Sequence, residues 1–232
     1  MQQVKGELVE IWFESGGTAG RIAFKEALDL RAGQYLAARC LEDGQPALAH
    51  ALFMAGAAPG GMLAAPPLPS TWQPGCELEL RGPLGHGFNL PVSARHVGLV
   101  ALASSPARLL PLAEQALAQQ GEVTLFCDLP ASDLPWRSLP SALEISPTAL
   151  LHESLAWADY LAFDVPQTHL PKLNPLLQLK PGEHLACPTE VLVDALMPCH
   201  GLAGCGVCAV PARRGWLLAC EDGPVFIWER LE

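Results

Sequence analysis

The stretch that decides the fold is Val97-Gly-Leu-Val-Ala-Leu-Ala103, together with the helical pattern that follows it. These residues are nearly all apolar, which is typical of a parallel strand buried on both faces. Ser104-Ser-Pro106 then predicts a helix start, because serine caps free N–H groups and proline fits the first turn. The helix is expected over Ala107–Gln120 and ends at Gly121, and Glu122–Cys127 predicts the next strand. The stretch therefore predicts a β-α-β unit.

The residues that follow continue this alternation. We expect strands at Leu143–Ser146, Tyr160–Val165 and His184–Cys187, with helices at Thr148–Ala158 and Thr189–Leu196. Strands that alternate with helices favour an open parallel sheet.

The first ninety residues predict short strands joined by turns. Val4–Phe13 has an alternating pattern, Ser15-Gly-Gly-Thr18 is a turn, and Arg21–Phe24 begins a return strand. Cys76–Leu80 alternates strictly between polar and apolar residues. Several such strands predict an antiparallel barrel.

We therefore predict an α+β, multidomain chain. Residues 1–92 form an N-terminal antiparallel β-barrel of a flavin-binding kind, and residues 93–196 form an α/β parallel-sheet domain of a nucleotide-binding kind. Residues 197–232 form a C-terminal segment rich in cysteine. The other cysteines, among them Cys40, Cys76 and Cys127, are spaced as lone strand residues and are expected in the core.

The C-terminal segment predicts a metal centre. Cys199, Cys205, Cys208 and Cys220 have the spacing C-x5-C-x2-C-x11-C. A short loop with three cysteines, closed by a fourth from a neighbouring strand, suits an iron-sulfur cluster of the 2Fe-2S type. The first gap is one residue longer than in the plant-type pattern. Either the loop bulges after Cys199, or His200, which restores the gap, is the first ligand. Thiolate is the usual ligand, which favours Cys199.

Zinc and disulfides are the alternatives for these four cysteines. Zinc suits two closely spaced pairs, and this stretch holds only one C-x2-C pair. Disulfides would require an oxidising compartment, which nothing in the sequence suggests.

Three motifs in the same order resemble those of a known family. Cys220-Glu-Asp-Gly-Pro-Val-Phe226 and Arg81-Gly-Pro-Leu-Gly-His-Gly-Phe88 resemble segments of the electron-transfer subunits of dihydroorotate dehydrogenase, a branch of the ferredoxin reductase-like group. Ala32-Gly-Gln-Tyr35 is similar to the Pro-Gly-Gln-Phe of that family. The resemblance spans residues 5 to 230. It implies a barrel that binds flavin, a nucleotide-binding domain, a 2Fe-2S segment and a role in pyrimidine biosynthesis.

The flavin and nicotinamide motifs of the family are degraded in this chain. The window of the family's Arg-Pro-x-Ser motif reads Ala47-Leu-Ala-His-Ala-Leu-Phe-Met-Ala-Gly56, which leaves His50 as the one polar residue for FAD. The family's glycine-rich run is replaced by Ala103-Ser-Ser-Pro-Ala107, so NAD binding is not expected. Ala186-Cys-Pro-Thr189 takes the place of a Cys-Gly-Pro run that ends the last strand near the nicotinamide. Cys187 is thus a candidate redox neighbour, although burial in the core is the commoner role.

Composition limits the partners. The net charge of −10, with only 14 basic residues, argues against nucleic acid or an anionic membrane. Only 16% of the residues are charged, which favours a hetero-oligomer whose partner covers apolar surface. The N-terminus has no signal-sequence pattern and no long apolar run follows, so we expect a cytoplasmic protein.

Two hypotheses follow for the function. The first is an iron-sulfur electron-transfer subunit of a cytoplasmic oxidoreductase, with the catalytic subunit of dihydroorotate dehydrogenase as the partner that the resemblance implies. The second is a degenerate reductase-like scaffold or docking subunit whose metal site is structural and holds zinc. The complete cysteine set favours the first, and the loss of both nucleotide motifs favours the second.

Overall fold

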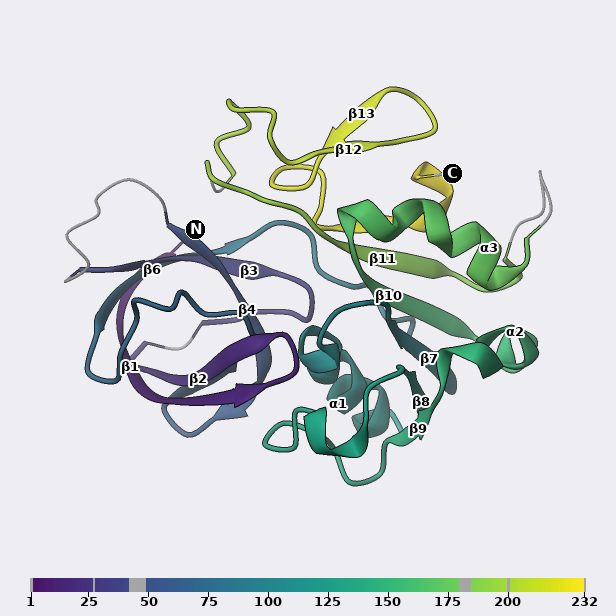
Figure 1. Ribbon diagram of the computed structural model, residues 1–232, viewed down its shortest axis with the longest axis horizontal. Coiled ribbons are helices and arrows are strands. Elements are labelled where there is room, and N and C mark those ends of the chain that lie inside the picture. The colour runs from purple at the N-terminus through teal and green to yellow at the C-terminus, as the bar shows by residue number, and fades with distance from the viewer. Residues whose placement is uncertain (1, 27, 42–48, 180–184, 200, 232) are drawn as a thin grey trace.

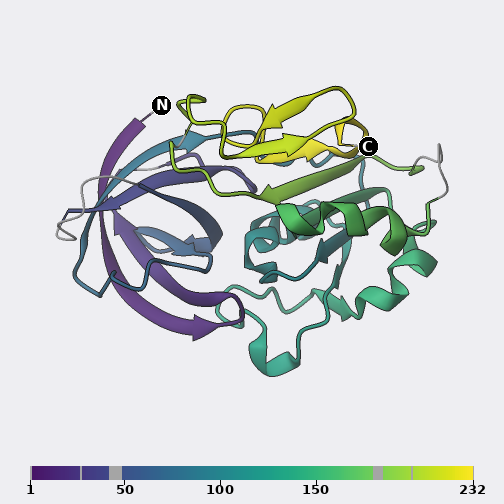
Figure 2. The same ribbon diagram turned by 45° about the horizontal axis from the view of Figure 1, so that its top comes forward.

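A closed barrel and a mixed sheet make up most of the molecule (Figure 1). The computed structural model describes residues 2–26, 28–41, 49–179, 185–199 and 201–231. In Figures 1 and 2 the C-terminal segment, coloured yellow-green to yellow, lies along one side of both the barrel and the sheet. Among the described residues, no helix has the length and apolar character needed to cross a bilayer.

The barrel is antiparallel, as predicted. Its strands are ordered β1-β2-β5-β4-β3-β6 around the wall. Alternate residues point inward, so Leu8, Ile22, Leu36, Leu52 and Leu78 are buried in its interior. The strand bounds are β1 Gln2–Glu14, β2 Gly17–Phe24, β3 Tyr35–Cys40, β4 His50–Ala58, β5 Gly61–Ala64 and β6 Glu77–Leu84.

The second sheet has the order β14-β11-β10-β7-β8-β9. Five of its strands are parallel to their neighbours, and β14 at one edge is antiparallel to β11. The bounds are β7 His96–Ala101, β8 Glu122–Phe126, β9 Glu144–Ser146, β10 Tyr160–Pro166, β11 Thr189–Asp194 and β14 Val225–Ile227. A separate hairpin pairs β12 Ala209–Pro211 with β13 Trp216–Leu218.

The predicted β-α-β unit is confirmed. Between β7 and β8 lie the 3-10 turn η1 (Pro106–Leu109) and the helix α1 (Leu110–Ala118). The Ser105 hydroxyl accepts a hydrogen bond from the N–H of Ala107 at 3.3 Å, so the serine caps η1, the 3-10 turn that leads into α1. The remaining helical elements are short: η2 Ala131–Asp133, η3 Thr148–Leu150, α2 Leu151–Ser154, η4 Gln167–Lys172, α3 Leu173–Leu177 and η5 Trp228–Arg230.

Two predictions near the end of the sheet are wrong. Thr189–Leu196, predicted as a helix, begins with the strand β11, which pairs with β10 and β14. Its residues Thr189–Val193 are buried on both faces, which is the pattern of an interior strand. Leu185–Cys187, predicted as part of a strand, has no strand structure, and His184 lies outside the described residues. Ala186–Thr189 thus leads into a strand instead of ending one.

Cys40 and Cys76 are not lone core residues, because the structure joins them in a disulfide. The bond links the end of β3 to the residue before β6. Cys127 and Cys187 are free and buried, as expected.

Candidate functional site

A hairpin brings together the last two predicted ligands. Cys208 directly precedes β12, and Cys220 is the second residue after β13. The register pairs Ala209 with Leu218, and the N–H of Ala219 donates to the carbonyl of Cys208 at 3.0 Å. Both side chains are buried, at 1% and 3% exposure. Burial, and then the hydrogen bond and the charge of Cys208, raise the pKa of Cys220 to about 12.

The loop before the hairpin holds the other two cysteines. Cys199 is half-buried, Cys205 is exposed, and their side chains are hydrogen-bonded to each other. Burial would raise the pKa of Cys199, but hydrogen bonds from the side chain and backbone of Cys205 and from the backbone of Gly204 and Leu202 lower it to about 7. Backbone groups directed at a sulfur are the surroundings in which a thiolate is stable.

The four cysteines therefore gather as two pairs. The charge of Cys199 acts on Cys220, so the pairs are neighbours. Within the described residues, no three His, Cys, Asp or Glu side chains lie closely enough together to hold a single metal ion. His200, the alternative first ligand, lies outside those residues.

The three motifs that carry the family resemblance meet next to these cysteines. The side-chain amide of Gln34 donates to the carbonyl of Gly85 at 3.0 Å. The N–H of His86 donates to the carbonyl of Gly223 at 2.6 Å, and His86 forms a β-bridge with Pro224. Segments that are far apart in sequence thus hold the cysteine segment against the barrel.

Two glycines of these motifs have no room for a side chain. A methyl group on Gly33 would lie 2.5 Å from a side-chain carbon of Val225, and one on Gly85 would lie 2.5 Å from the ring of Pro224. Both residues have positive φ angles, of +83° and +72°. Close approach and backbone conformation both require glycine at these positions.

The residues in the expected flavin window do not fit a flavin diphosphate in the manner of the family. The described part of the window lies at the start of β4. The ring of His50 packs edge-on against Trp72 with centroids 5.9 Å apart. Burial lowers the pKa of His50, which favours the neutral imidazole, although a hydrogen bond to the backbone of Pro67 and the charge of Asp194 oppose the shift. A neutral imidazole cannot balance a diphosphate charge, and the Phe53 ring of the same strand packs on protein side chains.

An arginine fills the edge of the sheet where α/β domains bind nucleotides. Arg108 in η1 donates to both carboxylate oxygens of Asp164, at 2.7 and 2.8 Å, and lies 3.1 Å from Asp194. Asp164 and Asp194 lie near the carboxyl ends of β10 and β11. The guanidinium also stacks over the Phe53 ring of the barrel, 5.4 Å from its centroid. Burial raises the pKa of Asp164 to about 6, because Arg108 only partly offsets the desolvation.

A turn of the barrel also covers the carboxyl ends of the sheet strands near Ser105. A methyl group on Gly16, in the turn between β1 and β2, would lie 2.9 Å from the Cβ of Ser105. The turn therefore packs directly against the start of the helix, where a phosphate would bind in a dinucleotide fold. Two carboxylates nearby would also repel a phosphate.

Sequence reasoning missed Arg108 and Asp164. A signal was present, because Asp164 is the one charged residue in the apolar run Tyr160–Val165. A carboxylate in a buried strand requires a partner, and an arginine in a buried helix start supplies one.

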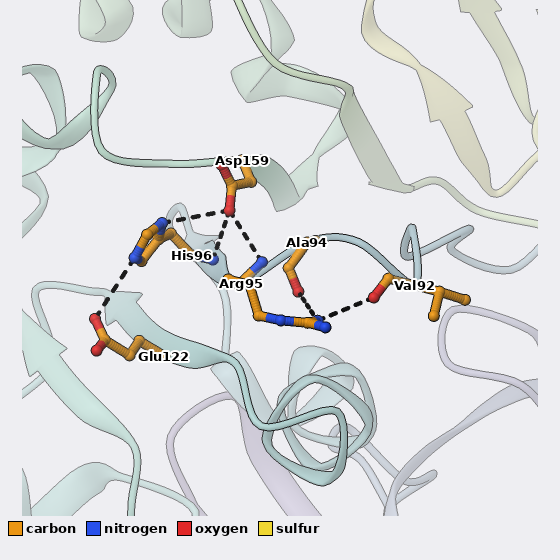
Figure 3. Close-up of polar contacts among 6 residues, drawn as sticks. All are labelled: Val92, Ala94, Arg95, His96, Glu122 and Asp159. Carbon is orange, nitrogen blue, oxygen red and sulfur yellow. Dashed lines mark hydrogen bonds and ion pairs between the residues drawn. The ribbon is translucent and has the colours of Figure 1, made fainter.

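A second group of charged side chains lies at the amino ends of the strands, opposite the end where Arg108 lies. In Figure 3 the Asp159 carboxylate accepts hydrogen bonds from the N–H groups of Arg95 and His96, at 2.9 and 3.0 Å. The His96 ring lies 3.3 Å from Asp159 and 3.9 Å from Glu122. These contacts hold the amino ends of β7 and β8 and are partly exposed. Cys187 belongs to this end of the strands, so it is not a neighbour of the predicted nicotinamide position.

A scan against known protein families found no match. Solved structures do match. The chain is similar to a chain of the NADH-dependent reduced ferredoxin-NADP oxidoreductase described for flavin-based electron bifurcation, with a TM-score of 0.72 and 19% identity over 98% of this chain and 89% of that chain. The chain has the ferredoxin reductase-like fold. It is also similar to the ferredoxin reductase in carbazole 1,9a-dioxygenase in its FAD apo form (TM-score 0.58, 16% identity, 76% of this chain and 63% of that chain). A third similar structure is the ferredoxin-NADP+ reductase from Plasmodium falciparum (TM-score 0.55, 11% identity, 76% of this chain and 89% of that chain).

Proposed function

We propose that this chain is an electron-transfer subunit that holds a 2Fe-2S cluster on Cys199, Cys205, Cys208 and Cys220. The observation that carries the proposal is the gathering of these residues as two thiol pairs, one on a loop and one on a hairpin. The likeness in fold to ferredoxin reductases supports an electron-transfer role.

The two-by-two arrangement supports a binuclear cluster over zinc. In a 2Fe-2S cluster each iron takes two thiolates, so the ligands belong in two neighbouring pairs. A structural zinc ion takes four ligands around one centre. No group of three such ligands surrounds a single point among the described residues. Cys199 and Cys205 would hold one iron, and Cys208 and Cys220 the other.

The two pairs would have different surroundings. When bound, the cluster would supply transfer of one electron at a time. The buried thiols of Cys208 and Cys220 exclude water on the barrel side, and Cys205 is exposed to solvent. Electrons would therefore enter or leave most readily on the side of Cys205, where a partner's redox group could approach.

The partner in this proposal is a larger oxidoreductase, with the catalytic subunit of dihydroorotate dehydrogenase as the one that the resemblance implies. A hetero-oligomer in pyrimidine biosynthesis would follow. Because Arg108 fills the nucleotide edge and His50 is a poor diphosphate contact, the partner and not a nucleotide would supply the electrons.

The second candidate is a scaffold or docking subunit with a structural zinc site. The observation in its favour is the same filled nucleotide edge, which would suit a chain that no longer handles electrons.

Metal analysis of protein purified without oxygen separates the two candidates. The account predicts about two irons and two acid-labile sulfides per chain, and an EPR signal of a reduced 2Fe-2S cluster after dithionite. Cys208→Ser and Cys220→Ser should lose the signal. Cys127→Ser is the matched control. Cys127 is buried and directly follows β8, and it is not one of the four proposed ligands. Zinc without iron would contradict the electron-transfer role and support the scaffold.

A further inference from the structure

Tyr35 has a buried hydroxyl that nothing among the described residues satisfies. The residue begins β3 and is 0% exposed. Its hydroxyl oxygen has no hydrogen-bond partner in the part of the chain that the structure describes. A buried hydroxyl without a partner costs about 1–3 kcal/mol, so an orphaned one indicates a missing acceptor or donor.

The surroundings of the hydroxyl point to the cysteine pairs. Its ring packs against Phe53, with centroids 5.8 Å apart. A methyl group on Gly201, in the cysteine loop, would lie 3.8 Å from the Tyr35 hydroxyl and 3.6 Å from the carbonyl of Cys220. The charges of Cys220, Cys208 and Cys199 all act on the phenol. The hydroxyl therefore lies next to the cysteine loop and next to the backbone of Cys220.

The phenol can act only as a donor toward these sulfurs. A tyrosine phenol, with an ordinary pKa of about 10, keeps its proton at neutral pH. Thiolates and inorganic sulfides are acceptors, and hydrogen bonds to them stabilise the more negative, reduced state of a cluster.

We propose that the Tyr35 hydroxyl donates a hydrogen bond to a sulfur of the cluster and raises its reduction potential. This inference rests on the proposed 2Fe-2S function. Tyr35 would not exchange electrons itself, and its effect would be on the reduction potential of the cluster. In the resembling motif the corresponding residue is Phe, so Tyr35→Phe removes the hydroxyl and keeps the ring.

The first test is a redox titration of Tyr35→Phe and of the natural protein, followed by EPR. The variant should bind as much iron and have a lower midpoint potential, with the one-electron equilibrium shifted by about tenfold, or ~59 mV. Tyr160→Phe is the matched control, because the chain has two tyrosines and the Tyr160 hydroxyl donates to the buried Glu190, away from the four cysteines. Its potential should be unchanged.

The second test has two parts. Urea unfolding is measured on the proteins without iron, and the effect of D2O on the iron-sulfur vibrations is measured on the proteins with iron. Without iron, Tyr35→Phe should unfold at the same or a higher urea concentration than the natural protein, because the orphaned hydroxyl is gone. With iron, D2O should shift the iron-sulfur vibrations of the natural protein more than those of the variant. If the variant has full iron content, an equal potential and an equal isotope shift, the role of Tyr35 is refuted. The proposed cluster itself is not contradicted by that result. Absence of iron from the natural protein would instead refute the proposed function, and this inference with it.

Discussion

Arg108 joins the barrel and the six-stranded sheet through charge and through packing. Its guanidinium is 6% exposed and binds Asp164, which is fully buried, in the sheet, while it stacks on Phe53 of the barrel. A buried pair of this kind adds little net stability when complete, because desolvation offsets the attraction. Breaking it leaves an unpaired buried charge, which is costly.

Arg108→Ala should therefore lower the free energy of unfolding by about 3 kcal/mol or more. Urea denaturation measures this change, with Arg214→Ala as the control at an exposed arginine, where a change within about 0.5 kcal/mol is expected. The double variant Arg108→Met with Asp164→Leu should recover part of the loss, because both charges are then replaced by apolar groups. A single variant as stable as the control would show that Arg108 does not hold the barrel against the sheet.

Among the elements, local patterns predicted the β-α-β unit and three of the six barrel strands, but not the cysteine pairing. Ser105, Pro106 and Gly121 mark the ends of their helix within a few residues, so they could be read directly. The pairing of Cys208 with Cys220 depends on the register between β12 and β13, which the spacing does not give. The strand β11 was missed because its neighbours β10 and β14, which bury both its faces, come from elsewhere in the chain.

The junction of the three motifs can be tested at Gly33. Gly33→Ala should cost about 2–4 kcal/mol, because a methyl group meets Val225 and the positive φ is strained. Gly75→Ala is the matched control, since Gly75 has a similar φ of +94° and nothing within 4 Å of an added methyl group. It should cost only the backbone strain of about 1 kcal/mol. Equal losses in urea denaturation would show that the motifs do not pack as tightly as the structure indicates.

At the scale of the whole molecule, the ferredoxin reductase-like fold is retained while its nucleotide edge is filled by the chain itself. The missing glycines between Ala103 and Ala107 predict that NAD does not bind at this edge, and this stays a prediction. The sequence could not predict what replaces the nucleotide, because Arg108, Asp164 and Asp194 are brought together only by the sheet and the helix start. The same holds for the orphaned Tyr35 hydroxyl, which depends on contacts between barrel and cysteine loop.

Arg108 and its two carboxylate partners occupy the edge of the sheet where a nucleotide would bind. We therefore predict that NADH and NADPH do not bind there. Either dinucleotide at millimolar concentration should leave the melting temperature unchanged, whereas a ligand at 100 times its Kd would add about 2.7 kcal/mol of stability. AMP at matched ionic strength controls for salt effects. A saturable rise in melting temperature with either dinucleotide would contradict the account of this edge.

We propose that the four cysteines hold two irons, each on one thiol pair. Mössbauer spectroscopy of protein labelled with the iron-57 isotope, before and after reduction by one electron, can decide this. We expect about two coupled ferric sites with sulfur ligands and no net spin, and then one ferrous and one ferric site per chain after reduction. Protein that takes up no iron, or holds it as a single isolated site, would rule out this arrangement.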